Sequence, residues 1–256
     1  MKLRIENLTF SYEGNTVVDR LSLDIKDGEF VSLLGPSGCG KSTVLKLLTG
    51  ILTPRSGSIL VDGQAVNGVS ERFAYMPQDD LLFPWKTILD NVCLYGQIHG
   101  SLSETRRKAL SWFPLFGLEG YEHAYPASLS GGMRQRAAFL RTALCRADIL
   151  LLDEPFGALD VITRGEMQDW LLLMREQMKK TVLLVTHDMD EAIYLSDRIL
   201  ILNPPPDGLS AALSVSASGR NREWLYSQSA LRAEIYSKIR RRQTAAAVKG
   251  EDPRPL

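Results

Sequence analysis

The stretch Gly35-Pro36-Ser37-Gly38-Cys39-Gly40-Lys41-Ser42-Thr43 has the spacing GxxxxGKST. Its glycines permit a tight backbone whose N–H groups point inward at phosphate oxygens. Lys41 supplies a positive charge for the β and γ phosphates, and the Ser42 hydroxyl is suited to Mg²⁺. The stretch therefore predicts a loop that binds the phosphates of a nucleotide, and with it an α/β fold.

The residues on either side of this loop have the patterns of a strand and a helix. Residues 30–34 form a short apolar run, and residues 42–50 carry apolar side chains at helical spacing with Gly50 as a C-cap. A strand that leads into a helix N-terminus binds anions, because its free N–H groups and the helix dipole favour negative charge. The alternative is a glycine-rich turn without function. The loop alone does not distinguish a kinase, a GTPase, a motor or a transporter ATPase.

The composition excludes several classes of protein. The 256 residues are 45% hydrophobic, which suits one α/β domain with an inserted subdomain. Lys plus Arg and Asp plus Glu number 30 each, so the charge balance does not suggest a nucleic-acid binder. Cys39, Cys93 and Cys145 have neither metal-ligand nor disulfide spacing, which fits a reducing cytosol. The charged N-terminus is not that of a signal peptide, and no apolar run approaches the ~20 residues of a membrane span.

Hydrophobic periodicity predicts an α/β core with a helical insertion and a less regular C-terminal part. Strands are predicted at residues 3–8, 21–25, 56–63, 72–76, 149–152, 182–185 and 199–202. Helices are predicted at residues 90–98, 103–116 with Ser103 as the cap, 162–178, 190–195 and 223–242. Residues 209–219 are expected to be a linker or irregular, and the last ten residues to be disordered. We expect the C-terminal amphipathic helix to pack on its own domain.

A second motif is the apolar run from Ile149 that ends in Asp153 and Glu154. It places two carboxylates at the C-terminal edge of a strand, where α/β sheets bind their ligands. We expect Asp153 to hold Mg²⁺ through water and Glu154 to polarise the attacking water. The alternative is a strand that simply ends in two solvent-facing acidic residues.

A third motif, Leu129-Ser130-Gly131-Gly132-Met133, lies just before a helix and upstream of the acidic strand. Ser130, Gly131 and Gly132 form another turn rich in N–H groups at a helix N-terminus. With this segment following the GxxxxGKST loop, the chain resembles the ATP-binding cassette (ABC) family, whose signature is LSGGQ. Met133 departs from the commonest fifth residue, but that position is variable in the family.

The resemblance runs from about residue 2 to residue 202 and implies roles for further residues. Tyr12 resembles the aromatic that stacks on adenine, and Gln78 the glutamine that contacts Mg²⁺ and the lytic water. Asp160 resembles the D-loop aspartate, and His187 the switch histidine on the γ-phosphate. The alternatives are a core tyrosine for Tyr12, a solvated turn residue for Gln78 and a structural histidine for His187.

The resemblance also implies the architecture of the chain. The expected fold is a P-loop NTPase of the ABC cassette type, with a RecA-like core sheet, an N-terminal antiparallel β subdomain and an inserted helical subdomain. The ATPase domain would cover residues 1–203, with the helical subdomain at about residues 87–146. Residues 204–256 would be a linker, the C-terminal helix and a disordered tail.

The resemblance finally implies ATP and Mg²⁺ as ligands and a set of partners. Cassettes pair head to tail, so that each signature caps the ATP held by the other; a homodimer is expected here. The apolar region from Gln78 to Trp85 matches the groove that receives a helix of a membrane permease subunit, and its alternative is that Phe83 and Trp85 pack inside the helical subdomain.

The run Leu-Leu-Phe-Pro-Trp from Leu81 to Trp85 resembles the nitrate/sulfonate/taurine importer subfamily, which includes importers of thiamine precursors. We therefore expect a cytoplasmic ATPase, peripheral on the inner face of the cell membrane, that serves a permease and indirectly a solute-binding protein, with no nucleic acid bound. A soluble ABC ATPase acting on nucleic acid or ribosomes and a nucleotide sensor without hydrolysis are the alternatives.

Overall fold

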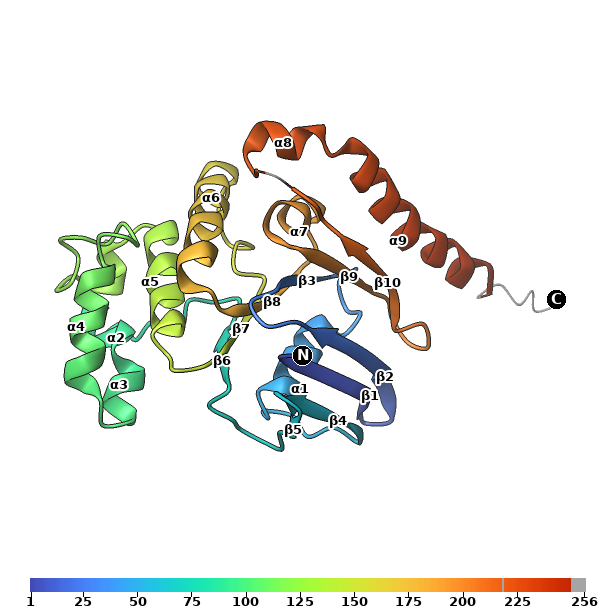
Figure 1. Cartoon of the computed structure of the whole chain (residues 1–256), viewed down its shortest axis with the longest axis horizontal. Coiled ribbons are helices and arrows are strands. Elements are labelled where there is room, and N and C mark those ends of the chain that lie inside the picture. The colour runs from blue at the N-terminus through green and yellow to red at the C-terminus, as the bar shows by residue number, and fades with distance from the viewer. Residues whose placement is uncertain (218, 250–256) are drawn as a thin grey trace, which may run out of the picture. The chain divides into compact units, whose positions relative to one another are not determined.

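The computed structural model describes residues 1–217 and 219–249, and within it the chain divides into two compact units. The first unit joins residues 1–68 to the chain from residue 184 onward, and the second consists of residues 69–183. The division falls inside strand β8 (Thr181–Thr186), and each unit contains both strands and helices (Figure 1).

An antiparallel sheet forms the N-terminal part of the first unit, with the strand order β2-β1-β4-β5 (Figure 1). Its strands are β1 (Leu3–Tyr12), β2 (Asn15–Ile25), β4 (Ser56–Val61) and β5 (Gln64–Ala65). Glu13 and Gly14 connect β1 to β2 with φ values of 44° and 86°, and this left-handed pair matches the twist of a two-residue hairpin. Leu3 and Ile5 alternate with exposed residues, as expected for a strand buried on one face.

A second group of strands in the first unit has the order β10-β9-β3. It contains β3 (Phe30–Leu34), β9 (Arg198–Leu202) and β10 (Leu209–Ser214). β3 runs parallel to β9, and all five of its residues are buried, as the apolar run predicts. The prediction of an irregular segment at residues 209–219 is wrong for β10, which pairs with β9 in antiparallel orientation. Its Ser and Ala residues have low strand propensity, so the pairing and not the local sequence makes it a strand.

The described part of the first unit contains four helices: α1 (Lys41–Leu48), α7 (Met189–Leu195), α8 (Arg222–Ser227) and α9 (Ser229–Lys249). After α1, Gly50 takes a φ of 75°, in agreement with its predicted place at the helix end. The single helix predicted at residues 223–242 is wrong, because the chain breaks at Gln228 between α8 and α9.

The C-terminal helix packs on its own unit, as expected. Ile235 of α9 is fully buried, and Arg232 Nε lies 2.6 Å from Asp190 Oδ1 on α7. The disorder predicted for the last ten residues is wrong for residues 247–249, which belong to α9. The rest of that prediction concerns residues 250–256, which lie outside the described part of the chain.

The second unit combines a parallel pair of strands with helices. The strands are β6 (Phe73–Met76) and β7 (Ile149–Asp153), and the four apolar residues of β7 are fully buried. The helices are α2 (Ile88–Val92), α3 (Leu94–Ile98), α4 (Leu102–Trp112), the 3₁₀ turn η1 (Pro126–Ser128), α5 (Gly131–Ala143) and α6 (Val161–Met178). The helix predicted at residues 90–98 divides at Cys93. Ser103 is not the cap of its helix, because α4 begins earlier, after Ser101.

An aromatic cluster joins α5 and α6 within the second unit. The Phe116 ring lies 4.7 Å from the Trp170 ring and 6.2 Å from the Phe139 ring, measured between centroids. Trp170 Nε1 also donates to the backbone oxygen of Leu115 at 3.1 Å. Aromatic pairs in edge-on contact, here Phe116–Trp170 and Phe139–Trp170, stabilise each other beyond their burial. The cluster therefore fixes helices α5 and α6, whose N-termini carry the signature segment (residues 129–133) and Asp160.

Asn91 of α2 holds the loop at residues 83–87 in place. Its side chain is fully buried, and its Oδ1 accepts a hydrogen bond from the amide of Phe83 at 2.7 Å. Its Nδ2 lies 3.0–3.1 Å from the backbone oxygens of Phe83, Lys86 and Thr87. One buried amide therefore satisfies several peptide groups of a loop that has no regular structure of its own.

We expect Asn91→Ala to lower the free energy of unfolding by about 1–3 kcal/mol, because it leaves buried peptide groups of this loop without partners. Urea unfolding followed by tryptophan fluorescence measures the change. Gln97→Ala, at an exposed position of the same unit, is the control and should have little effect. Equal midpoints for the two variants would contradict the role of Asn91.

Candidate nucleotide-binding site

The phosphate loop has a conformation that only glycine permits at two of its positions. A Cβ on Gly35 would lie 2.2 Å from the backbone oxygen of Leu202 and 2.8 Å from Cys39 Sγ. Gly40 has a φ of 101°, and a Cβ there would lie 2.8 Å from the backbone oxygen of Val17. The glycines of the motif are therefore required by the fold of the loop itself as well as by the approach of a phosphate.

Lys41 is held against the loop that precedes it. The side chain is buried, and Nζ donates to the backbone oxygens of Gly35 at 2.8 Å and Pro36 at 3.0 Å. Helix α1 begins at Lys41 after Gly40, which has no side chain to accept from the first-turn N–H groups of Ser42 and Thr43. The loop thus combines a fixed positive charge with a helix N-terminus, which is the arrangement that binds phosphate.

Cys39 fills the space beneath the loop. Its thiol is buried, and burial raises its pKa although the neighbouring Lys41 charge acts in the opposite direction. The thiol therefore stays neutral at physiological pH and serves as a small packing group.

Two further predicted residues of the first unit lie at strand ends. His187 follows β8 and is exposed in the turn before α7, whose N-terminus Asp188 caps by accepting from the amide of Asp190 at 2.8 Å. Tyr12 ends β1, is 44% exposed and contacts Phe10 edge-on with centroids 4.7 Å apart. The alternative of a core tyrosine is therefore wrong, and the exposed ring is available for stacking.

In the second unit, the position of Asp153 on β7 brings its carboxylate within hydrogen-bond distance of a tyrosine. Asp153 is buried at the C-terminal end of the strand, and Tyr75 Oη donates to its Oδ2 at 3.0 Å. Tyr75 belongs to β6, which runs parallel to β7 with Tyr75 opposite Leu151. Burial, followed by the Asp153 charge, raises the pKa of Tyr75, so the phenol remains a proton donor at neutral pH.

The side chains of Glu154 and Gln78 both lie beside Gly157. A Cβ on Gly157 would lie 3.5 Å from Gln78 Nε2 and 3.9 Å from Glu154 Oε2. Glu154 also has a φ of 45°, in the left-handed region that L-residues rarely adopt. Such strain is concentrated at functional positions, where the surrounding fold maintains it.

The signature segment and Asp160 each begin a helix. Ser130 is the N-cap of α5, and its Oγ accepts from the amide of Met133 at 3.3 Å, while Gly131 and Gly132 form the first turn. Asp160 is the N-cap of α6 and accepts from the amides of Ile162 and Thr163 at 3.1 Å. Hydrogen bonds from Thr163 lower the pKa of Asp160, so it is ionised at neutral pH.

The predicted Mg²⁺ ligands have the right chemistry. The Ser42 hydroxyl, the Asp153 carboxylate and the Gln78 amide oxygen are hard oxygen donors of the kind that Mg²⁺ uses together with phosphate oxygens. Within residues 1–217 and 219–249, no group of three His, Cys, Asp or Glu side chains is placed to hold a metal.

Comparison with known proteins agrees with these motifs. The profile of the ABC transporter family matches residues 18–157. The formylaminopyrimidine import ATP-binding protein ThiZ of Halalkalibacterium halodurans is 47% identical over 206 residues, 80% of this chain and 80% of its own length. The chain belongs to the ABC transporter family. The predicted family and the predicted ATPase class are therefore confirmed.

Other similar proteins agree with the predicted subfamily and fold. The aliphatic sulfonates import ATP-binding protein SsuB of Bacillus cereus is 41% identical over 199 residues, which cover 77% of this chain and 78% of SsuB. The taurine import ATP-binding protein TauB of Yersinia pestis is 40% identical over 86% and 87% of the two chains. The solved dimer of the ATP-binding cassette MJ0796 bound to ADP and Pi has a TM-score of 0.71 at 30% identity, covering 84% of this cassette and 99% of that chain. The importer subfamily and the cassette fold class are confirmed.

Some expectations about the site stay predictions. The roles assigned to individual residues and the domain limits at residues 87, 146 and 203 rest on motifs and hydrophobic patterns in the sequence. No helix in the described part of the cassette has the length and apolarity needed to cross a bilayer.

Tyr75 is a site residue that the sequence patterns do not identify. Its contact with Asp153 depends on the register of β6 and β7, which are far apart in the sequence, and no local pattern of residues encodes that register.

We expect Tyr75→Phe to raise the Mg²⁺ concentration for half-maximal ATPase activity about threefold, with a smaller effect on the rate at saturating Mg²⁺. Without the phenol, Asp153 loses a hydrogen bond worth about 1 kcal/mol that orients its carboxylate. ATPase assays over a Mg²⁺ series test this, with Tyr95→Phe as a control in the same unit. An unchanged Mg²⁺ dependence would show that the bond does not orient Asp153.

Proposed function

We propose that this chain is the ATP-hydrolysing subunit of an importer, and that a dimer of cassettes drives uptake of a small solute through separate membrane subunits. The observation that carries the proposal is the 47% identity, over 80% of the chain, with an import ATP-binding protein. The relatives are named as import proteins for formylaminopyrimidine, aliphatic sulfonates and taurine. These names support a small solute within the predicted nitrate, sulfonate, taurine or thiamine-precursor group. The relatives differ in solute, which supports cargo selection by other subunits.

Binding of ATP would use the rigid features of the first unit. The amides of the phosphate loop and of the first turn of α1 would bind the phosphates, and buried Lys41 would exchange its bonds to loop carbonyls for bonds to phosphate oxygens. The exposed ring of Tyr12 would stack on adenine.

Hydrolysis would use the carboxylates and amides after the strands. Glu154 would polarise the attacking water, Gln78 beside it would orient that water, and His187 would donate to the γ-phosphate. Ser42, Asp153 and Gln78 would hold Mg²⁺, which when bound neutralises charge on the phosphates. Most of the rate enhancement in such a reaction comes from positioning and electrostatic stabilisation, which agrees with the restrained Lys41, Asp153 and Glu154.

The complete site would need a second cassette. The signature segment presents the N-terminus of α5 with Ser130 as cap, and it lies in a different unit of the chain from the phosphate loop. In a head-to-tail pair, each signature would cap the ATP bound by the other cassette, and Asp160 would lie at the same interface. The cassette dimer solved for MJ0796 supports this arrangement. A homodimer with twofold symmetry is the simplest form.

The contact with the membrane subunits would use an aromatic platform formed by Leu81, Phe83 and Trp85. These side chains are 60%, 38% and 70% exposed, whereas the neighbouring Leu82 is buried. The Phe83 and Trp85 rings lie 5.2 Å apart, so they form one apolar surface held by Asn91. Their exposure counts against packing inside the helical subdomain. A cytoplasmic location at the inner face of the membrane, with a solute-binding protein on the other side, would follow.

We expect Glu154→Gln to retain ATP binding and to hydrolyse ATP at least about 100-fold more slowly, because an amide is too weak a base to activate water. The variant should accumulate as an ATP-bound dimer in size-exclusion chromatography with light scattering. Glu166→Gln, at an exposed position of α6, is the control. Hydrolysis by Glu154→Gln at the wild-type rate would show that the assigned base is wrong.

We expect Trp85→Ala to reduce capture of integral membrane proteins by the tagged cassette from detergent-solubilised membranes of its own organism. Exposed aromatic anchors at interfaces typically contribute about 2 kcal/mol or more when truncated. Quantitative mass spectrometry of the captured proteins gives the measurement, and Tyr121→Ala, an exposed aromatic elsewhere in the unit, is the control. Equal capture of a permease by both variants would place its contact elsewhere.

A further inference from the structure

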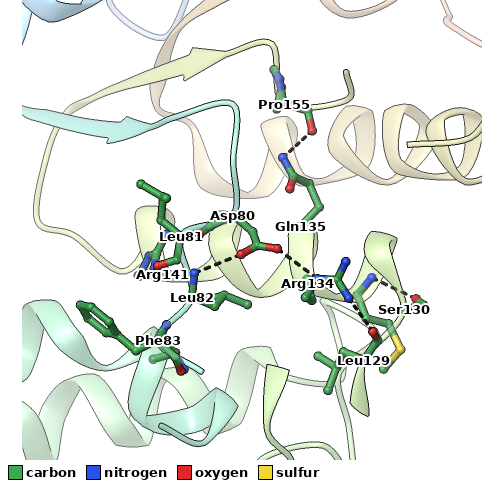
Figure 2. Close-up of polar contacts among 12 residues, drawn as sticks. Asp80, Leu81, Leu82, Phe83, Leu129, Ser130, Arg134, Gln135, Arg141 and Pro155 are labelled. Carbon is green, nitrogen blue, oxygen red and sulfur yellow. Dashed lines mark hydrogen bonds and ion pairs between the residues drawn. The ribbon is translucent and has the colours of Figure 1, made fainter. Parts of the chain in front are cut away.

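Helix α5 is bonded through its first turns to two segments that carry predicted functional residues. Arg134 Nε lies 3.1 Å from Asp80 Oδ2, two residues after Gln78 (Figure 2). The next residue, Gln135, is buried and donates from Nε2 to the backbone oxygen of Pro155 at 2.5 Å, one residue after Glu154 (Figure 2). Consecutive residues of one helix therefore contact the segments that follow Gln78 and Glu154.

The same arginine also contacts the signature segment. Arg134 Nη1 donates to the backbone oxygen of Leu129 at 2.9 Å, so one guanidinium joins Asp80 to the first residue of the signature (Figure 2). Because a guanidinium is planar and presents its donors in a fixed fork, the positions of its two partners are coupled.

A second arginine of α5 holds the backbone of the Asp80 segment. Arg141 Nη2 donates to the backbone oxygen of Asp80 at 2.6 Å, and Arg141 Nη1 to that of Leu81 at 2.7 Å. Asp80 in turn accepts from the amide of Leu82 at 3.1 Å through Oδ1, which makes a tight turn. The platform residue Leu81 lies within this turn, and Phe83 and Trp85 follow it.

We propose that the Asp80–Arg134 ion pair is a positioning pair, which holds the signature segment in the orientation that caps a partner's nucleotide and makes it move together with the aromatic platform. The inference rests on the proposed function, since it assigns a task to the signature in the cassette dimer. Any displacement of Asp80 by a partner bound at the platform must break the bonds to Arg134 and Arg141 or carry α5 with it. If α5 moves together with Asp80, the displacement reaches Leu129 and Ser130 at the N-terminus of the helix.

The Asp80–Arg134 ion pair is partly exposed to solvent, and this limits its contribution to the stability of the unit. Its side chains are 37% and 28% exposed, so the interaction is moderate and not that of a buried, rigid pair. Loss of one charge should therefore misorient the signature without unfolding the unit, because Arg141 and Gln135 keep their own bonds. The loss would therefore weaken binding of a second copy of the chain, and it would leave nucleotide binding to the phosphate loop of the same chain unchanged.

The test uses the full chain in the Glu154→Gln background, with ATP as the probe. Asp80→Asn keeps an acceptor for the Leu82 amide but removes the charge that Arg134 contacts. We expect it to weaken ATP-driven dimerisation about tenfold in analytical ultracentrifugation, roughly threefold for each of the two signatures. The affinity of the monomer for a fluorescent ATP analogue, measured at low protein concentration, should change by less than about twofold.

Matched variants separate positioning from a general structural effect. Glu104→Gln removes another ion pair of the same unit, in which Arg146 Nη2 lies 2.6 Å from Glu104 Oε2, and should leave dimerisation unchanged. Asp80→Glu, which keeps the carboxylate, should restore part of the dimer affinity. In an Arg134→Gln background, Asp80→Asn should have no further effect, because its partner is already absent.

The outcomes distinguish this inference from the proposed function. If the Glu154→Gln parent binds ATP and dimerises but Asp80→Asn dimerises equally well, the positioning pair is wrong and the proposed function stands. Equal loss of monomer nucleotide affinity and dimer affinity, or fully additive effects of Asp80→Asn and Arg134→Gln, would also overturn the pair. If the parent neither binds ATP nor dimerises, the proposed function is wrong and the inference falls with it.

Discussion

The close approach of two backbones at the end of a parallel strand pair is the constraint on which the nucleotide site depends. β3 and β9 pair with Leu34 opposite Ile201, so the next residues, Gly35 and Leu202, meet where no Cβ fits. This contact sets where the phosphate loop leaves the sheet. Lys41 can then return to the carbonyls of Gly35 and Pro36, and α1 can begin with its N–H groups uncapped by a side chain. The chemistry of the loop thus follows from sheet packing between segments distant in sequence.

The second unit is organised around α5. Its hydrogen bonds reach the segment after Gln78, the segment after Glu154 and the signature itself, while the aromatic cluster of Phe116, Phe139 and Trp170 fixes it to α6. Charged and amide side chains bonded to backbone oxygens are a way to fix loops that lack regular structure, because each bond restrains a specific peptide group. Regions that would contact the nucleotide, the partner cassette and the membrane subunits are therefore attached to one helix.

Local patterns predicted most of the strands and helices, and failed where tertiary pairing overrides propensity. β10 has two Ser and two Ala among its six residues and becomes a strand through its pairing with β9. The helix predicted at residues 223–242 divides at Gln228, and the apolar residues at helical spacing, Leu231 and Ile235, lie in α9 alone. Ser103 has the residue type of a cap, but α4 already begins after Ser101. The motifs of the candidate site are easier to recognise in the sequence than the fold around them, and the roles of their residues stay predictions. Glycines, a lysine and acidic residues would act there through short-range geometry, which requires particular residue types at particular spacings.

The sequence by itself determined the family, the ATPase class and the residues expected to bind nucleotide, because each of these motifs is a contiguous segment whose chemistry depends on local order. Only the tertiary structure decided how those residues are supported. Tyr75 meets Asp153 through the register of β6 and β7, Arg134 joins Asp80 to Leu129, and Asn91 holds the exposed Phe83 and Trp85. These contacts join residues far apart along the chain and use common side chains in common surroundings. Their partners follow from packing and strand register, which no local pattern of residues encodes.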